Sequence, residues 1–176
     1  GVPPGCELVL TLADAVSRAS HLRLAGLLTH AGHAYRCRDR GEVRQVAAEE
    51  RAALLEAAAV LHERGVAVPA LSLGSTPTVA VVDHLEGITE ARPGNYVFYD
   101  VFQSRLGVCR LADVALSVLA TVIGCHAERD TVVIDAGALA LSKDRGAEHV
   151  PGWDGGYGLV LDAESGASLP VVLHSL

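Results

Sequence analysis

Three short polar segments contain the residues of this sequence that are best suited to binding a ligand. They are THAGHAY at 29–35, GSTPT at 74–78 and RPGN at 92–95, and each follows a short apolar run. In a sheet of parallel strands the carboxyl ends of the strands meet on one face, and binding sites are built there. We therefore expect the three segments to lie close together in the folded chain.

The second and third segments have the composition of a phosphate-binding site. Gly74, Ser75 and Thr76 offer backbone N–H groups and two hydroxyls, and Gly94 and Asn95 offer further N–H groups at a turn where glycine allows close approach. Each segment alone is typical of an ordinary turn. Because all of them follow strand ends in succession, we favour a phosphate cradle. Such a cradle needs no lysine, which suits a chain that contains a single one.

The histidines near the first strand suggest different roles. His30 follows the strand directly, which favours stacking or proton handling, whereas His33 is better explained as a solvated loop residue. Their spacing would suit a metal, but only Cys37 lies nearby with ligand-like spacing, so we predict no metal site. Asp135 and the charged run 143–145 are better explained as solvated turns.

Apolar periodicity predicts the elements that position these segments. We expect a long helix at 41–65, which Gly65 would end, and a short helix at 79–85. Apolar runs predict three strands within 22–29, 68–78 and 88–94, the first of them buried on both faces. This alternation predicts an α/β fold with parallel strands joined by right-handed crossovers. Beyond Tyr99, β-type runs without intervening helices predict an antiparallel β region, at 112–124, 129–141, 156–162 and 169–176.

Composition excludes several classes of partner. The formal net charge is −7, which argues against binding to nucleic acid or to an anionic membrane surface. No apolar run approaches the roughly 18 residues of a membrane-spanning helix, and the start lacks signal-peptide features. The four cysteines form no C-x-x-C pair, so we expect reduced thiols, mostly packed, and a cytoplasmic location. The sequence lacks methionine and stops within an expected strand, so we expect an internal fragment of a longer protein.

Four segments resemble the family of D-serine dehydratases and D-threonine aldolases, which are pyridoxal-phosphate enzymes of the alanine racemase fold. These segments are GLLTHAGHAY, SLGSTPT, EARPGNYVFYD and VVIDAGALALSKDRG, in matching order and spacing, and RPGNYVFYD is the most specific. The resemblance implies the C-terminal part of a (β/α)8 barrel over residues 1–105. It implies the start of an antiparallel β domain over residues 106–176.

The resemblance also implies a pyridoxal phosphate site. Its phosphate would be contacted by Ser75, Thr76, Gly94 and Asn95. The pyridine ring would stack on His30, and Tyr35 would line the site. Arg92 would approach the pyridine nitrogen. The family's Schiff-base lysine lies on the first barrel strand, outside this chain, and Lys143 matches no such position. The catalytic residue is therefore unknown, and some relatives have an aromatic residue where this chain has Leu28.

The family's metal ligands also lie outside this chain, so the zinc or manganese that we expect belongs to the full-length protein. The implied activity is that of a lyase acting on D-3-hydroxy amino acids. Dehydratase and aldolase activity both stay open, although HAGHAYRC and RPGNYVFYD look closer to the dehydratase branch. Alternatives are an amino-acid racemase of the same fold and a non-catalytic cofactor-binding fragment. We expect the partner to be a small D-amino acid, the full-length protein to be a homodimer, and the isolated chain to be inert.

Overall fold

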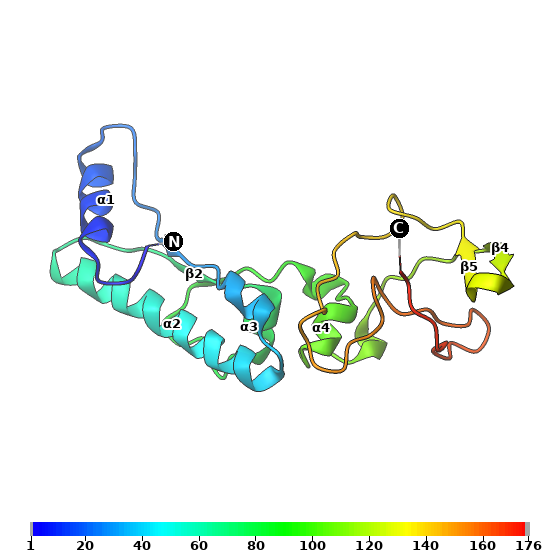
Figure 1. The fold of residues 1–176 in the computed structure, drawn as a ribbon. Helices are drawn as coiled ribbons and strands as arrows, with labels where there is room; N and C mark the ends of the chain where they lie inside the picture. The colour runs from blue at the N-terminus through cyan, green and yellow to red at the C-terminus, as the bar shows by residue number, and fades with distance from the viewer. Residues whose placement is uncertain (1, 175–176) are drawn as a thin grey trace. The chain divides into compact units, whose positions relative to one another are not determined.

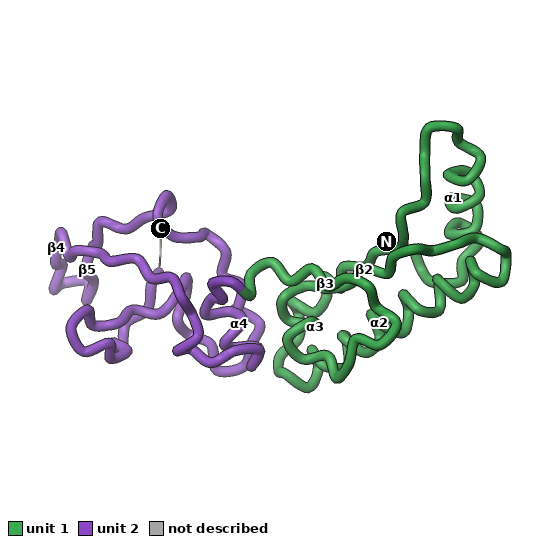
Figure 2. The backbone as a smooth tube through the Cα atoms, turned by 180° about the vertical axis from the view of Figure 1, so that it is seen from behind, with its two compact units in different colours: residues 1–96 green, residues 97–176 purple. Residues whose placement is uncertain are grey.

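The structure, a computed structural model, describes residues 2–174 of the chain (Figure 1). It divides into two compact units, residues 1–96 and residues 97–176 (Figure 2). The first unit combines a parallel sheet with helices, and the second contains an antiparallel strand pair. The predicted α/β class is therefore confirmed. Within the described residues, no helix combines the length and apolar character needed to cross a membrane.

The sheet of the first unit has three parallel strands, as predicted. These are β1 (Leu27–Leu28), β2 (Leu71–Leu73) and β3 (Glu90–Ala91), and β2 lies between the other two. The strands are shorter than the apolar runs that predicted them. The expectation that the first strand is buried on both faces is wrong here, because Leu28 is 72% exposed. Within residues 2–174, β1 is an edge strand that pairs only with β2.

The long predicted helix is confirmed as α2 (Arg40–Glu63) (Figure 1). It begins where the Asp39 side chain accepts a hydrogen bond from the Glu42 N–H, and a left-handed Gly65 follows its end. Its apolar face packs on β2, and Leu54, Leu71 and Leu73 form a buried core cluster. Burying a leucine in this way stabilises a fold by roughly 1.5–3 kcal/mol.

Two helices of the first unit differ from expectation. Helix α1 (Glu7–Arg18) is not among the predicted elements, and it buries only Ala13. The short helix α3 (Thr76–Val81) begins three residues earlier than the predicted start at residue 79. The reason lies in the GSTPT segment, where Thr78 Oγ1 accepts a bond from the Ser75 N–H and a proline occupies the first turn. This segment is therefore a helix start rather than a loop.

The second unit begins with α4 (Val101–Arg105) and contains β4 (Val122–His126) and β5 (Thr131–Ile134), which pair antiparallel as predicted. Up to residue 174, the later β-type runs form only isolated bridges, Gly156 with Leu173 and Leu161 with Ser168. A turn interrupts them where Asp162 accepts bonds from Ser165. The last two residues of the predicted run 169–176 lie outside the described residues.

Short 3-10 helices complete both units at Gly32–Arg36, Asn95–Val97, Leu111–Asp113 and Ala127–Arg129. The four cysteines are free thiols, as predicted. Cys37 is buried, and burial raises the pKa of its thiol, whereas Cys125 is exposed on β4. Cys6 and Cys109 are half-buried, so the expectation that the cysteines are mostly packed is met by Cys37, met in part by Cys6 and Cys109, and not met by Cys125.

Candidate functional site

The three polar segments follow the carboxyl ends of the three parallel strands, and Arg92 of the third segment bonds both the first segment and β2. Its Nε donates to Ser72 Oγ at 2.6 Å, and its terminal nitrogen donates to the Thr29 carbonyl. Its backbone N–H donates to the carbonyl of Leu73 at 2.9 Å. The guanidinium, which is always charged, is therefore held at the ends of β1 and β2.

His30 and Tyr35 lie together beside the turn that follows β2. The Nδ1 atom of His30 is 3.2 Å from the carbonyl oxygen of Gly74. Because a carbonyl only accepts, Nδ1 is the donor, and Nε2 of the neutral ring is left as an acceptor. The His30 side chain is exposed, and its ring centroid is 6.4 Å from that of Tyr35 on the Gly32–Arg36 turn. An aromatic ligand would find an accessible imidazole here.

Ser75 and Thr76 are both buried, but their hydroxyls face different partners. Ser75 Oγ lies 3.0 Å from Thr78 Oγ1, within the first turn of α3. Thr76 Oγ1 accepts a bond from the backbone N–H of Tyr96 at 3.1 Å. Thr76 acts as the acceptor in that bond, so its own hydroxyl proton is not used in it.

Gly94 and Asn95 form the turn after β3. Gly94 is exposed, and a Cβ placed on it would meet no described atom within 4 Å. Its φ lies outside the left-handed range, so the backbone itself does not require glycine there. Asn95 is half-buried and begins the Asn95–Val97 turn. An exposed backbone beside the Thr76 hydroxyl, with Arg92 and His30 on the same strand ends, fits a phosphate-bearing aromatic cofactor.

Glu50, which is not among the predicted site residues, is buried on α2 at 6% exposure. Its Oε1 accepts from Thr29 Oγ1 at 3.1 Å, from the Ala31 N–H at 3.0 Å and from the Gly74 N–H at 3.3 Å. The Gly74 and Ser75 N–H groups are thus bonded within the chain, so the expectation that they face a ligand is corrected. Helical spacing could have indicated its burial, because residue 50 lies three positions after the buried Ala47 and so on the same face of the helix.

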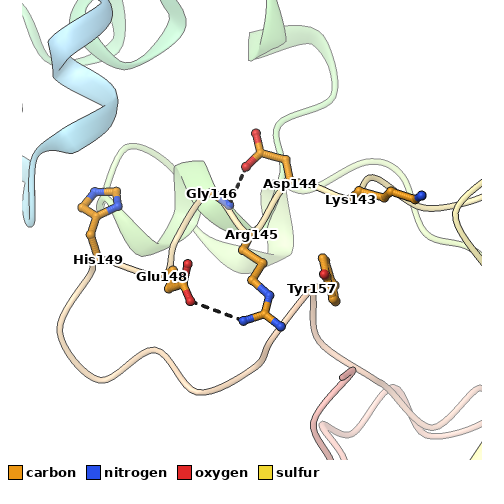
Figure 3. Close-up of a pocket in the computed structure, with 7 residues that line it drawn as sticks. All are labelled: Lys143, Asp144, Arg145, Gly146, Glu148, His149 and Tyr157. Atoms are coloured by element: carbon orange, nitrogen blue, oxygen red, sulfur yellow. Dashed lines mark hydrogen bonds and ion pairs between the residues drawn. The ribbon is translucent and has the colours of Figure 1, made fainter. Parts of the chain in front are cut away.

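A second polar cluster surrounds a pocket of about 450 Å³ in the second unit (Figure 3). Arg145 bonds Glu148 at 3.3 Å, and its Cζ lies 4.8 Å from the ring centroid of Tyr157. Hydrogen bonding to Tyr157 raises the pKa of Arg145. Figure 3 shows the Asp144 carboxylate bonded to a neighbouring backbone N–H and the Lys143 side chain extending away from the other residues.

The charged run 143–145 is exposed, as its interpretation as a solvated turn predicts, and so is Asp135. Opposite charges alternate around the pocket and compensate one another, which makes the strand ends of the first unit the stronger candidate site. Across residues 2–174, no three His, Cys, Asp or Glu side chains are grouped so that they could hold a metal ion.

Residues 1–101 match the family described as "Alanine racemase, N-terminal domain", and residues 115–174 match the one described as "Putative serine dehydratase domain". The chain is 44% identical over 153 residues to D-threo-3-hydroxyaspartate dehydratase of Delftia sp. (strain HT23). It is 37% identical over 157 residues to D-serine dehydratase of Dictyostelium discoideum. Each match covers 85% of this chain and 40% of the relative, so the chain spans about two fifths of these relatives.

Solved structures agree with the sequence matches. D-threo-3-hydroxyaspartate dehydratase from Delftia sp. HT23 superposes with a TM-score of 0.87 at 41% identity, covering 96% of this chain and 44% of that one. A variant of D-threo-3-hydroxyaspartate dehydratase solved in a metal-free form gives 0.86 at 41% identity, covering 95% and 44%. D-threonine aldolase from Filomicrobium marinum is less similar, with a TM-score of 0.61 at 28% identity over 82% of this chain and 39% of that one.

Proposed function

Because this chain belongs to the family of D-serine dehydratases and D-threo-3-hydroxyaspartate dehydratases of alanine racemase fold, we propose that it forms the cofactor-binding part of a pyridoxal-phosphate-dependent lyase. Its substrates would be D-3-hydroxy amino acids. One observation carries the proposal: His30, Thr76 and Arg92 converge on the ends of adjacent parallel strands in a chain 44% identical to such a dehydratase.

We propose that residues 1–105 contribute to a (β/α)8 barrel and that residues 106–176 contribute to a β domain. Parallel strands joined by helices in the first unit and an antiparallel pair in the second support this assignment. The boundary at residue 105 stays a prediction.

The side chains of this chain would bind and orient the cofactor. When bound, pyridoxal phosphate supplies an electron sink for charge that develops at the substrate Cα. The Thr76 hydroxyl proton and the backbone at Gly94 and Asn95 would hold the phosphate, and the exposed His30 ring would stack on the pyridine. The permanent charge of Arg92 would disfavour protonation of a ring nitrogen beside it.

The metal ion that the family resemblance implies does not fit the described residues. Residues 2–174 bring together no ligand set for it, so its zinc or manganese site would lie in other parts of the full-length protein. The side chains of this chain are therefore assigned to the cofactor and not to the metal.

Dehydration is favoured over aldol cleavage and over racemisation, the two other reactions considered for this fold. The dehydratase structure is more similar to this chain than the aldolase structure, in both TM-score and identity. The match of residues 115–174 to a serine dehydratase domain favours a dehydratase over a racemase. We propose loss of the β-hydroxyl and the α-proton as water, which leaves an enamine. The enamine tautomerises to an imine, and a water molecule hydrolyses that imine to a 2-oxo acid and ammonia.

The test is an assay of the full-length protein with pyridoxal phosphate and zinc or manganese. D-Serine should give pyruvate and ammonia, and D-threo-3-hydroxyaspartate should give oxaloacetate and ammonia. Conversion of D-threonine to glycine and acetaldehyde without ammonia release would indicate an aldolase. Formation of L-serine from D-serine would indicate a racemase, and no turnover with any substrate would contradict the lyase proposal.

A further inference from the structure

Glu50 is the one charged residue on the buried face of α2. That face consists of six residues, of which the other five are apolar: Val43, Ala47, Glu50, Leu54, Ala57 and Leu61. A buried carboxylate is costly unless it is hydrogen-bonded. The presence of Glu50 on this buried face therefore needs a reason beyond packing.

The reason lies in the donors that reach Glu50 from two separate strand-end segments. Thr29 Oγ1 and the Ala31 N–H belong to the segment after β1, and the Gly74 N–H belongs to the turn after β2. All three donate to the same oxygen, Oε1. Glu50 thus joins segments that are about 45 residues apart in sequence but adjacent in the sheet.

His30 lies inside this network. Its two sequence neighbours, Thr29 and Ala31, both donate to Glu50, and its own Nδ1 is 3.2 Å from the Gly74 carbonyl. Gly74 bonds Glu50 through its N–H and His30 through its carbonyl, so the contacts form a closed ring. Moving either segment would break at least one bond of that ring.

We propose that Glu50 is a positioning residue: its Oε1 fixes the His30 segment against the Gly74 turn and thereby sets the orientation and tautomer of the His30 ring. What that ring faces rests on the proposed function. The hydrogen-bond network itself exists without a cofactor and can be tested without one.

The network depends on an acceptor oxygen, which predicts how substitutions differ. Glu50 Oε2 is buried and has no hydrogen-bond partner within residues 2–174, so all three bonds use Oε1. Glu50→Gln keeps an acceptor oxygen of the same reach. Glu50→Leu removes the acceptor and leaves the Ala31 and Gly74 N–H groups unpaired. Glu49→Leu is the matched control, because Glu49 is exposed on the same helix. Within residues 2–174, the Glu49 side chain is hydrogen-bonded only to Gln45.

The experiment uses NMR of the full-length protein without cofactor, with ¹⁵N-labelled histidine rings, the His30 signal being assigned by His30→Gln. We expect a protonated Nδ1 on His30 and slow amide exchange at Ala31 and Gly74. Glu50→Leu should abolish the His30 tautomer preference and speed exchange of both amides by about tenfold or more. Glu50→Gln and Glu49→Leu should resemble the parent. In a parallel pyridoxal phosphate titration, the Kd should rise about tenfold in Glu50→Leu but not in Glu50→Gln.

An unchanged His30 signal in folded Glu50→Leu overturns the proposal, as does a Glu50→Gln variant that behaves like Glu50→Leu. If Glu50→Leu does not fold, the parent protein and Glu50→Gln test the proposal instead. Fast amide exchange at Ala31 and Gly74 in either of these two proteins overturns it. An unprotonated His30 Nδ1 in either of them overturns it as well. A parent protein that shows the network but binds no pyridoxal phosphate would contradict the proposed function and leave the positioning role of Glu50 standing.

Discussion

The side-chain oxygen of Thr76 accepts a hydrogen bond from the backbone N–H of Tyr96 at 3.1 Å, which ties the start of α3 to the chain just after the RPGN turn. The other end of that turn is fixed by Arg92, which bonds Ser72 and the Thr29 carbonyl. Gly94 and Asn95 therefore lie between two anchored residues. This arrangement holds an exposed backbone in place before any ligand arrives, which lowers the entropic cost of binding.

Replacing Thr76 with valine should weaken this anchor. Thr76→Val would leave the Tyr96 N–H without its acceptor, and because Tyr96 is 52% exposed, water can replace that acceptor. The free energy of unfolding should therefore fall by about 0.5–1.5 kcal/mol. Pyridoxal phosphate binding should weaken as well, but less than on substitution of Gly94. Denaturant unfolding and cofactor titration measure the two effects. Thr76→Ser keeps the acceptor oxygen, so it should lose less stability and less cofactor affinity than Thr76→Val. An equal loss in both variants would argue against this hydrogen bond.

The buried amide of Gln103 offers a stability prediction in the second unit. Gln103 is fully buried on α4, and neither its Oε1 nor its Nε2 has a hydrogen-bond partner within residues 2–174. Gln103→Met has a similar volume and removes the unpaired polar atoms, so the free energy of unfolding should rise by about 1–3 kcal/mol. Gln45→Met, on the exposed side of α2, should change it by less than about 0.5 kcal/mol. A clear loss of stability in Gln103→Met would show that the amide has a partner in solution.

Part of this fold follows from local sequence patterns. The 3.6-residue periodicity of residues 41–65 and the left-handed Gly65 predict α2, and the alternation of apolar runs with helices predicts the parallel sheet. The polar segments follow those runs, so their convergence on one end of the sheet is predictable too. The roles of individual residues there, such as cofactor contacts by His30 and Arg92, stay predictions.

Other features depend on contacts between distant residues. Glu50 receives its hydrogen bonds from residues 19 to 24 positions away, and nothing in the helix sequence names those donors. The early start of α3 depends on the Ser75–Thr78 bonds, which compete with the turn that GSTPT would otherwise form. Leu28 reads as a buried strand residue, but its burial would require a neighbour on the open edge of β1.

The ion pair between the exposed Arg110 and the half-buried Asp113 gives a pH prediction. A side-chain hydrogen bond from Arg110, aided by its backbone N–H at 2.8 Å, lowers the pKa of Asp113 from 3.8 to about 2. Because this pKa is depressed in the folded state, the contribution of Asp113 to stability is complete above pH of about 4 and disappears as the pH falls through about 2. NMR titration of the Asp113 carboxyl should therefore show a midpoint near 2. Arg110→Gln should move that midpoint toward 3.8 without moving that of Asp162; an unchanged Asp113 midpoint would mean that the pair does not persist in solution.

Gly94→Val tests whether the RPGN turn holds a phosphate. In the described chain, a Cβ at Gly94 meets nothing within 4 Å and the backbone is not left-handed, so the substitution should leave folding unchanged. A bound phosphate, in contrast, would lose backbone hydrogen bonds that are worth about 1.5–3 kcal/mol each when charge-assisted. One lost bond corresponds to a roughly tenfold to hundredfold rise in the Kd for pyridoxal phosphate.

Titration of the full-length protein with pyridoxal phosphate, followed by absorbance or fluorescence, measures this rise. Gly158→Val is the matched control, because a Cβ there also meets no described atom within 4 Å and Gly158 lies outside the proposed cradle. Its Kd should equal that of the parent. His30→Ala should instead change the absorbance of the bound cofactor more than its affinity, since a stacked ring contacts the pyridine rather than the phosphate. If Gly94→Val folds normally and binds pyridoxal phosphate as tightly as the parent, the turn at residues 92–95 does not contact the phosphate and the cradle must be sought elsewhere.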